Sequence, residues 1–221
     1  MNKNKDDEIL FHLNRCNLMT TKLLKKVTRN NSWLNESLRR MEWQKKVYHR
    51  DLGRFGGFVW ASYNITKRES FDHDLPLADI YTSLQMTGRL LDWEQPKDKY
   101  ENELNEDATF HFAAGDGSLK YYLEFETGKN NWSLIDSKFA RYLVERKSDR
   151  FHVLFVLRDE KLKKIEQMAA RAERFLDKDK PSTWKLFLFT AAEKLTTEPL
   201  GQICSTAYDT RLYPLAPDLI K

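Results

Sequence analysis

Cysteine is scarce in this 221-residue chain, and glycine and proline are no more frequent than in ordinary globular proteins. The two cysteines, Cys16 and Cys204, lie 188 positions apart, and no Cys-x-x-Cys pair occurs. This spacing excludes a disulfide framework and a zinc knuckle, and it makes a reducing cytosol the expected compartment. Eight glycines and six prolines exclude a collagen-like chain, and 41% hydrophobic residues exclude a largely disordered one.

Long apolar runs are also absent. No stretch of 18 apolar residues occurs, so we expect no membrane-spanning helix and no membrane insertion. Met1–Glu8 is charged with no apolar stretch behind it, so we expect no signal peptide and a cytoplasmic location. The length suits one large domain or two small ones, each able to bury a core.

The net charge of +4 is divided unevenly along the chain. Residues 1–68 contain 15 Lys or Arg and 6 Asp or Glu, whereas residues 69–221 contain 22 and 27. This division predicts a polyanion-binding domain at 1–68, joined to a second domain at 69–221. A basic surface that only contacts solvent is the alternative.

Apolar residues at helical spacing predict three short helices in the first domain. The inward-facing residues are Ile9, Leu10, Leu13 and Cys16, then Leu23, Leu24 and Val27, then Leu34, Leu38 and Met41. Thr20 or Thr21 is the expected N-cap of the second helix, and Ser32 that of the third. A hairpin follows, with strands at 45–50 and 58–63 around a Gly-rich turn. This order is that of a winged helix-turn-helix, whose third helix enters the major groove of DNA.

Long basic side chains on these elements suit phosphate binding, because neutralised phosphates release counterions. The candidate DNA contacts lie on the second helix, the third helix and the hairpin: Lys22, Lys25, Lys26, Arg29, Arg39, Arg40, Arg50 and Arg54. A winged helix that mediates dimerisation or protein contacts is the alternative. We favour DNA, because the excess charge falls on the elements that would contact it.

Strand and helix patterns alternate in the second domain. Residues 64–74 lack periodicity and are expected to form a linker, and residues 75–91 have the apolar spacing of a packing helix. The expected elements after them are a hairpin with strands at 107–112 and 119–126, a buried strand at 151–157, an amphipathic helix and a strand at 184–190. This order predicts an α/β sandwich around a mixed sheet.

Two acidic residues on the second hairpin strand are the first candidates for a site. Alternation turns the odd, mostly apolar positions of this strand toward the core and places Tyr122, Glu124 and Glu126 on the other face. Two carboxylates about 7 Å apart repel each other, and a divalent cation relieves that repulsion. Asp107, at the start of the neighbouring strand, can supply a third oxygen ligand. Such ligands favour Mg²⁺ or Mn²⁺ over Zn²⁺.

Lys138 completes the candidate group. Residues 133–136 have a capping-box pattern, and the helix that they begin places Lys138 on the flank of its apolar stripe, within reach of the acidic strand. An ammonium beside a metal-bound phosphate can orient the attacking group and stabilise developing charge. The alternative is structural: carboxylates on a solvent-exposed strand face, a turn aspartate and a lysine at the edge of the core.

The order Asp107, Glu124-x-Glu126 and Lys138 on the next helix resembles a PD-(D/E)XK nuclease core in which the lysine has migrated. More closely, a winged helix followed by EDATF, YYLEFETGKNN and DSKFARYLV resembles the replication-relaxation family, which includes the MobC-type relaxases of mobilisable plasmids. The similarity covers nearly the whole chain and is most specific at 122–142. It implies a winged helix-turn-helix followed by a restriction-endonuclease-like α/β sandwich.

The resemblance also implies a function. A plasmid mobilisation relaxase binds an origin of transfer and nicks one DNA strand, using Mg²⁺ or Mn²⁺, to start conjugative transfer. Carried over by position, Asp107, Glu124, Glu126 and Lys138 form the active site, with the three carboxylates as metal ligands, and His73 matches a family histidine. The implied partners are plasmid DNA at the origin of transfer, a coupling protein or relaxosome accessory factor, and a second copy of the chain.

The chain departs from the family at two positions. Glu106 precedes Asp107 where the family often has proline, and Glu126 stands where it often has aspartate. The five histidines are scattered, which argues against the commoner relaxases with a histidine triad and a tyrosine nucleophile. Tyr122 lies near the acidic strand and is a candidate nucleophile, with packing as the alternative. Activated water is the simpler hypothesis.

Two other functions stay open. The chain can be a non-catalytic winged-helix protein that regulates plasmid replication or transcription, in which case Glu124 and Glu126 are dispensable. It can also be a restriction-type nuclease that cuts both strands and yields linear DNA.

Overall fold

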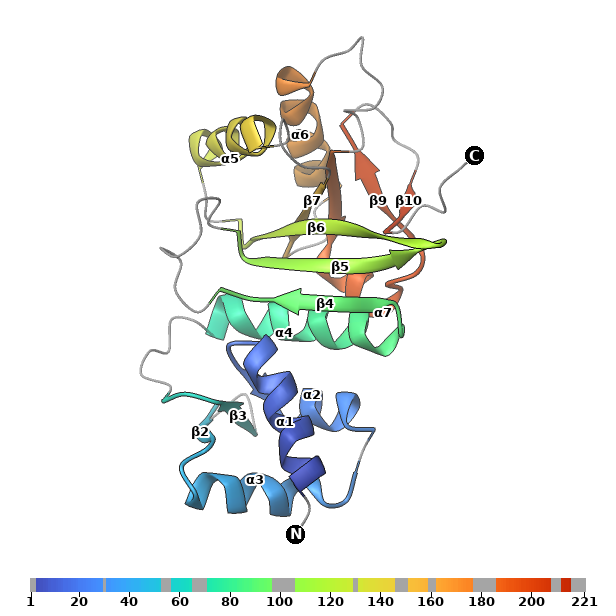
Figure 1. Cartoon of the computed structure of the whole chain (residues 1–221). Coiled ribbons are helices and arrows are strands. Elements are labelled where there is room, and N and C mark those ends of the chain that lie inside the picture. Colours follow the sequence, from blue (N-terminus) through green and yellow to red (C-terminus); the bar gives the residue numbers. More distant parts are fainter. Residues whose placement is uncertain are drawn as a thin grey trace. The chain divides into compact units, whose positions relative to one another are not determined.

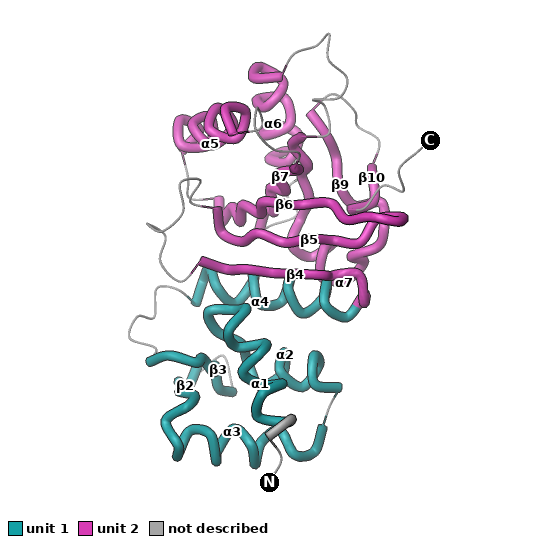
Figure 2. The backbone as a smooth tube through the Cα atoms, viewed as in Figure 1, with its two compact units in different colours: residues 1–86 teal, residues 87–221 magenta. Residues whose placement is uncertain are grey.

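The computed structural model describes residues 3–29, 31–52, 57–64, 71–96, 106–128, 131–145, 151–158, 162–176, 186–207 and 212–215. The chain forms two compact units, residues 1–86 and residues 87–221, which we call unit 1 and unit 2 (Figure 2). No helix in these described ranges is long and apolar enough to cross a membrane.

Unit 1 combines helices with a small antiparallel sheet (Figure 1). Its elements are α1 (Lys3–Arg15), β1 (Met19–Thr20), α2 (Thr21–Val27), α3 (Leu34–Trp43), β2 (Tyr48–Asp51), β3 (Phe58–Ala61) and α4 (Phe71–Met86). The strands lie in the order β1-β3-β2, all antiparallel. The three predicted helices and the hairpin are confirmed. The strand β1 was not predicted, because two residues are too few to show a period.

The predicted apolar stripes form the core of unit 1. All their inward-facing residues are buried except Leu10, which is half-buried. Thr20 caps α2, because its hydroxyl oxygen accepts a hydrogen bond from the backbone N–H of Leu23 at 3.1 Å. The prediction of Ser32 as the cap of α3 is wrong, since this helix has no side-chain cap. Ser37, which was not among the predicted inward-facing residues of α3, is also buried.

The helix α4 differs from the prediction. It begins at Phe71, within the expected linker, and ends at Met86, so a helix that continues to Leu91 is wrong. It belongs to unit 1, because it packs against α2 and β1. Its buried side chains include Leu77 and Ile80. The boundary therefore falls after Met86 instead of residue 68. With α4 included, unit 1 contains 15 basic and 10 acidic residues, a smaller excess than residues 1–68 have.

Unit 2 is built on a seven-stranded mixed sheet in the order β10-β9-β8-β7-β6-β5-β4. Its elements are β4 (Leu90–Glu94), β5 (Ala108–Ala114), β6 (Gly117–Glu126), α5 (Trp132–Glu145), β7 (His152–Leu157), α6 (Leu162–Ala172), a 3-10 turn η2 (Glu173–Phe175), β8 (Phe187–Ala191), α7 (Ala192–Thr197), β9 (Gln202–Thr206) and β10 (Tyr213–Pro214). Strands β4, β5 and β6 are antiparallel, and β6, β7 and β8 are parallel. The mixed sheet is confirmed.

Several elements of unit 2 were predicted incompletely. The strand β4 replaces the end of the expected helix, and β9 and β10 lie beyond residue 199, where no element was predicted. The first residues of the strand expected at 184–190 lie outside the described residues, and β8 runs from 187 to 191.

Both faces of the strand β6 are buried from Tyr121 to Glu126. Helices α5 and α6 pack on one face, where Phe139 lies with its ring centroid 5.0 Å from Phe155 and 4.9 Å from Phe187 (Figure 1). On the opposite face, Tyr121 stacks on Phe110 with centroids 4.8 Å apart. The even positions of β6 therefore point into a core beneath α5. This corrects the expectation that only the odd positions face a core.

Candidate functional site

Glu124 and Glu126 point from β6 to the side that α5 covers. They share this face with Tyr122, as the period-two pattern predicted, and Tyr122 packs in the core with Phe151 and Tyr142. The exposed fractions of Glu124 and Glu126 are 0% and 2%. The alternative of carboxylates on a solvent-exposed face is therefore wrong, and two buried carboxylates need a cation to offset their desolvation.

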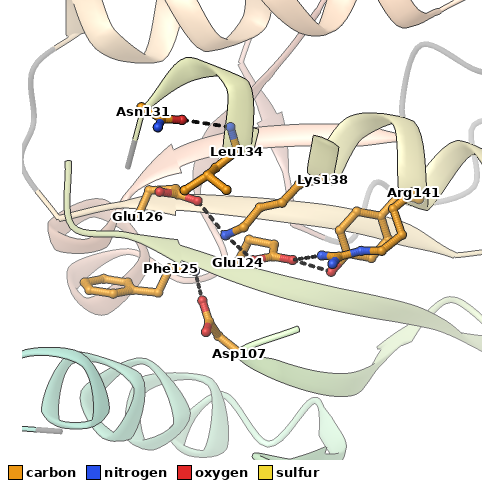
Figure 3. Close-up of polar contacts among 9 residues, drawn as sticks. Asp107, Glu124, Phe125, Glu126, Asn131, Leu134, Lys138 and Arg141 are labelled. Atoms are coloured by element: carbon orange, nitrogen blue, oxygen red, sulfur yellow. Dashed lines mark hydrogen bonds and ion pairs between the residues drawn. The ribbon is translucent and has the colours of Figure 1, made fainter. Parts of the chain in front are cut away.

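Lys138 provides that cation from α5 (Figure 3). Its Nζ lies 2.6 Å from Oε2 of Glu124 and 2.7 Å from Oε1 of Glu126. The sequence had predicted that Lys138 lies within reach of this strand. Burial alone would lower the pKa of Lys138, but the two carboxylates outweigh burial and raise the pKa above its usual range. The ammonium therefore stays charged and bridges both carboxylates.

Glu124 is the most perturbed carboxyl in the group. Burial raises its pKa to about 7, although the nearby Lys138 acts in the opposite direction. Tyr142 donates a hydrogen bond to Oε1 of Glu124 at 2.5 Å, and a guanidinium nitrogen of Arg141 lies 3.7 Å from the same oxygen. Strongly perturbed carboxyls with specific charged partners are typical of functional sites, although structural ion pairs also produce them.

Tyr142 and Arg141 were missed as candidates. The aromatic ring of Tyr142 suits packing in the core, and the residue is fully buried. The signal that identifies it is its spacing of four residues from Lys138, which places both side chains on one face of the helix.

The N-terminus of α5 is capped by Asn131. The helix begins at Trp132, and Oδ1 of Asn131 accepts hydrogen bonds from the backbone N–H of Leu134 at 3.0 Å and from Oγ of Ser133 at 2.7 Å. Asn131 thus has the capping role that we had predicted for Ser133 (Figure 3).

Asp107 lies just before β5 and is buried, but it is bonded differently from the two glutamates. Its Oδ2 accepts a hydrogen bond from the backbone N–H of Phe125 at 2.7 Å (Figure 3). Its own N–H donates to the carbonyl of Leu123 at 3.0 Å. Its negative charge still acts on Glu124 and Lys138, where it raises both pKa values. Asp107 is therefore near the pair and binds the backbone of the acidic strand.

The donor set is compatible with a divalent cation. Oε2 of Glu124 is a buried oxygen whose contact is the Lys138 ammonium at 2.6 Å, which it shares with Oε1 of Glu126. Mg²⁺ is commonly held by one or two carboxylates, with water and phosphate oxygens as the other ligands. Among the described residues, no three His, Cys, Asp or Glu side chains converge in a metal-binding arrangement. A site with Asp107 as third ligand stays a prediction.

The remaining candidates lie in unit 1. Five of the predicted DNA contacts are exposed: Lys22, Lys25, Lys26, Arg29 and Arg39. Arg40, expected outside, is half-buried and binds Asp6 at 2.5 Å, and Arg50 is half-buried on β2. Arg54 lies outside the described residues. His73, on α4, has its Nδ1 3.3 Å from Oδ1 of Asp74.

No protein family matches this chain, and no curated protein matches its sequence significantly.

Proposed function

We propose that this chain is a metal-dependent DNA-nicking enzyme of the relaxase type, which binds a plasmid origin of transfer and cuts one strand to start conjugative transfer. One observation carries the proposal: the buried carboxylates of Glu124 and Glu126 converge on a single cationic nitrogen, that of Lys138. Oxygen ligands that converge on one cation are what phosphodiester cleavage with Mg²⁺ or Mn²⁺ requires.

The fold of unit 2 supports this proposal. An antiparallel meander, a covering helix and a parallel strand (β4-β5-β6-α5-β7) are the elements that a restriction-endonuclease-like core needs. In that arrangement Glu124 and Glu126 hold the metal ion, and Lys138 binds the scissile phosphate. A bound divalent cation would supply Lewis-acid activation of the phosphodiester and of a water nucleophile. Tyr122 packs in the core, which favours water over a tyrosine nucleophile.

Unit 1 is the proposed DNA-binding domain. The element order α1-β1-α2-α3-β2-β3 and the strand order β1-β3-β2 are compatible with a winged helix-turn-helix. The exposed basic side chains of α2 and α3, such as Lys25 and Arg39, would contact phosphates. We place the protein in the cytoplasm, with plasmid DNA, a coupling protein or accessory factor, and a second copy of itself as its proposed partners.

A specific observation favours the second candidate, a non-catalytic regulator. Lys138 neutralises the acidic pair without a metal, and Asp107 is hydrogen-bonded to the backbone. A structural ion cluster would have the same contacts.

A nicking assay separates these functions. The substrate is supercoiled plasmid carrying the transfer origin of the replicon that encodes this chain, with Mg²⁺ or Mn²⁺ and an EDTA control. We expect metal-dependent open circles from the wild type and a loss of about 100-fold or more in Glu124→Gln with DNA binding retained. Glu166→Gln, an exposed glutamate of α6, is the matched control and should nick normally.

Two other products would count against the relaxase. Supercoils that stay intact despite tight binding, with accessory factors present, favour the regulator. Linear DNA from a double-strand cut favours the restriction-type nuclease.

A further inference from the structure

The hydroxyl of Tyr142 has a specific place in the buried group. Tyr142 is fully buried, and its ring packs against Tyr122 and Phe151, with centroids 5.7 Å and 6.2 Å away. Phenylalanine would fill this position equally well. A buried hydroxyl without a partner is destabilising, so the hydrogen bond to Oε1 of Glu124 explains how the core accommodates a polar atom here.

The two oxygens of Glu124 have different partners. Oε1 accepts from the Tyr142 hydroxyl at 2.5 Å, with Arg141 at 3.7 Å, whereas Oε2 lies 2.6 Å from the Lys138 ammonium. The Tyr142 hydroxyl is the donor in this bond, because an ionised carboxylate only accepts. A carboxylate bound at one oxygen cannot rotate without breaking that bond, so its other oxygen keeps its direction.

We propose that Tyr142 is a positioning residue, which holds Glu124 so that Oε2 faces the cation shared with Glu126. The cation is the Lys138 ammonium in the free protein and, on the basis of the proposed function, a divalent metal ion in the active one. Hydrogen-bond partners of metal ligands typically change metal affinity by about 10- to 100-fold when removed. Tyr142 therefore sets the metal affinity without touching the metal.

The first test measures metal binding by the full chain without DNA. Free Mn²⁺ is counted by electron paramagnetic resonance during titration of wild type, Tyr142→Phe and Tyr121→Phe. Tyr121→Phe is the matched control, because its hydroxyl also donates a buried hydrogen bond, to the carbonyl of Leu215, from the opposite face of β6. We expect Tyr142→Phe to weaken Mn²⁺ binding about 10-fold or more and Tyr121→Phe to bind as the wild type does.

The second test is independent of metal. A double-mutant cycle of Glu124→Gln and Lys138→Met, read from urea unfolding, gives the coupling of this ion pair. The coupling between Glu124 and Lys138 is expressed as a ratio of unfolding constants. We expect this ratio to be about 10-fold smaller in the Tyr142→Phe background than in the wild-type background, and unchanged in the Tyr121→Phe background.

The outcomes separate the two proposals. Unchanged Mn²⁺ affinity or unchanged coupling in Tyr142→Phe overturns the positioning role. A wild type that binds no Mn²⁺ with or without DNA refutes the metal-dependent function, and the coupling cycle alone then decides the role of Tyr142. A lower kcat for nicking by Tyr142→Phe, with an unchanged KM for DNA, would support both the metal-dependent function and the positioning role.

Discussion

Replacement of Lys138 by methionine tests whether the ammonium neutralises the buried acidic pair. Methionine keeps most of the length and the apolar stem of the side chain but removes the charge. Glu124 and Glu126 then face each other at 0% and 2% exposure without the cation that lies 2.6 Å and 2.7 Å from them. Loss of one partner from a buried ion pair usually destabilises a protein by about 3–5 kcal/mol.

The size of the loss depends on pH, because an unpaired buried carboxylate can take up a proton. Burial raises the pKa of Glu124 from 4.5 to about 7 although Lys138 lowers it, so loss of the ammonium raises this pKa further. Holding this carboxyl protonated at pH 7, when the unfolded chain would ionise it, costs about 3 kcal/mol at about 1.4 kcal/mol per pKa unit. At pH 5 the same proton costs less than about 1 kcal/mol. The wild type already carries much of this cost at Glu124, so about 3 kcal/mol is the upper bound of the loss for each carboxyl that takes up a proton in Lys138→Met at pH 7. We expect a much smaller loss at pH 5.

The assay is urea unfolding of the full chain at pH 7 and pH 5, followed by circular dichroism. The double variant Lys138→Met/Glu124→Gln should recover most of the loss at pH 7, because it removes one of the two unpaired charges. Lys163→Met, an exposed lysine of α6, is the matched control and should stay within about 0.5 kcal/mol of the wild type. An equal loss at both pH values would refute the electrostatic reasoning and indicate lost packing instead.

Three further predictions concern other parts of the chain. Burial lowers the pKa of His12 to about 4. The stability contributed by neutral His12 is therefore complete above pH 6.5, and about 3 kcal/mol of it is lost as the pH falls to 4. Thermal melting of His12→Gln should depend less on pH than that of the wild type. Phe139→Ala should destabilise unit 2 by about 3–5 kcal/mol in urea, and the exposed Leu134→Ala by less than about 1 kcal/mol. Lys25→Ala and Arg39→Ala should each reduce the slope of log K against log salt for DNA binding by about 1, and an unchanged slope would remove that residue from the interface.

Features set by local periodicity could be predicted from the sequence. The stripe of Leu34, Leu38 and Met41 and the buried strand β7 follow from spacing alone, because side-chain direction repeats every 3.6 or 2 residues. The same alternation correctly grouped Glu124 with Glu126. The reach of Lys138 followed from its place beside an apolar stripe.

Features set by tertiary packing could not be predicted. Leu90–Glu94 continues an apolar spacing that suits a helix, and it becomes β4 by pairing with β5. The burial of Glu124 depends on α5 crossing over β6, which no local pattern specifies. The same crossing decides that the hydroxyl of Tyr142 meets this carboxylate. The backbone bond of Asp107 depends on the register of β5 against β6.

The position of the acidic pair bears on why the chain retains it. The surrounding residues of the core are apolar and aromatic, including Tyr122, Phe139 and Phe155. Replacement of a buried ion cluster by well-packed apolar residues is often neutral or stabilising, so stability alone is a weak reason to keep three charges here. Half-exposed Arg141 and 19%-exposed Lys138 leave the cluster at the edge of this core, where a phosphate could reach the ammonium. A buried carboxylate pair with a cation that opens toward solvent suits chemistry better than it suits packing, which is why we rank the enzyme above the regulator.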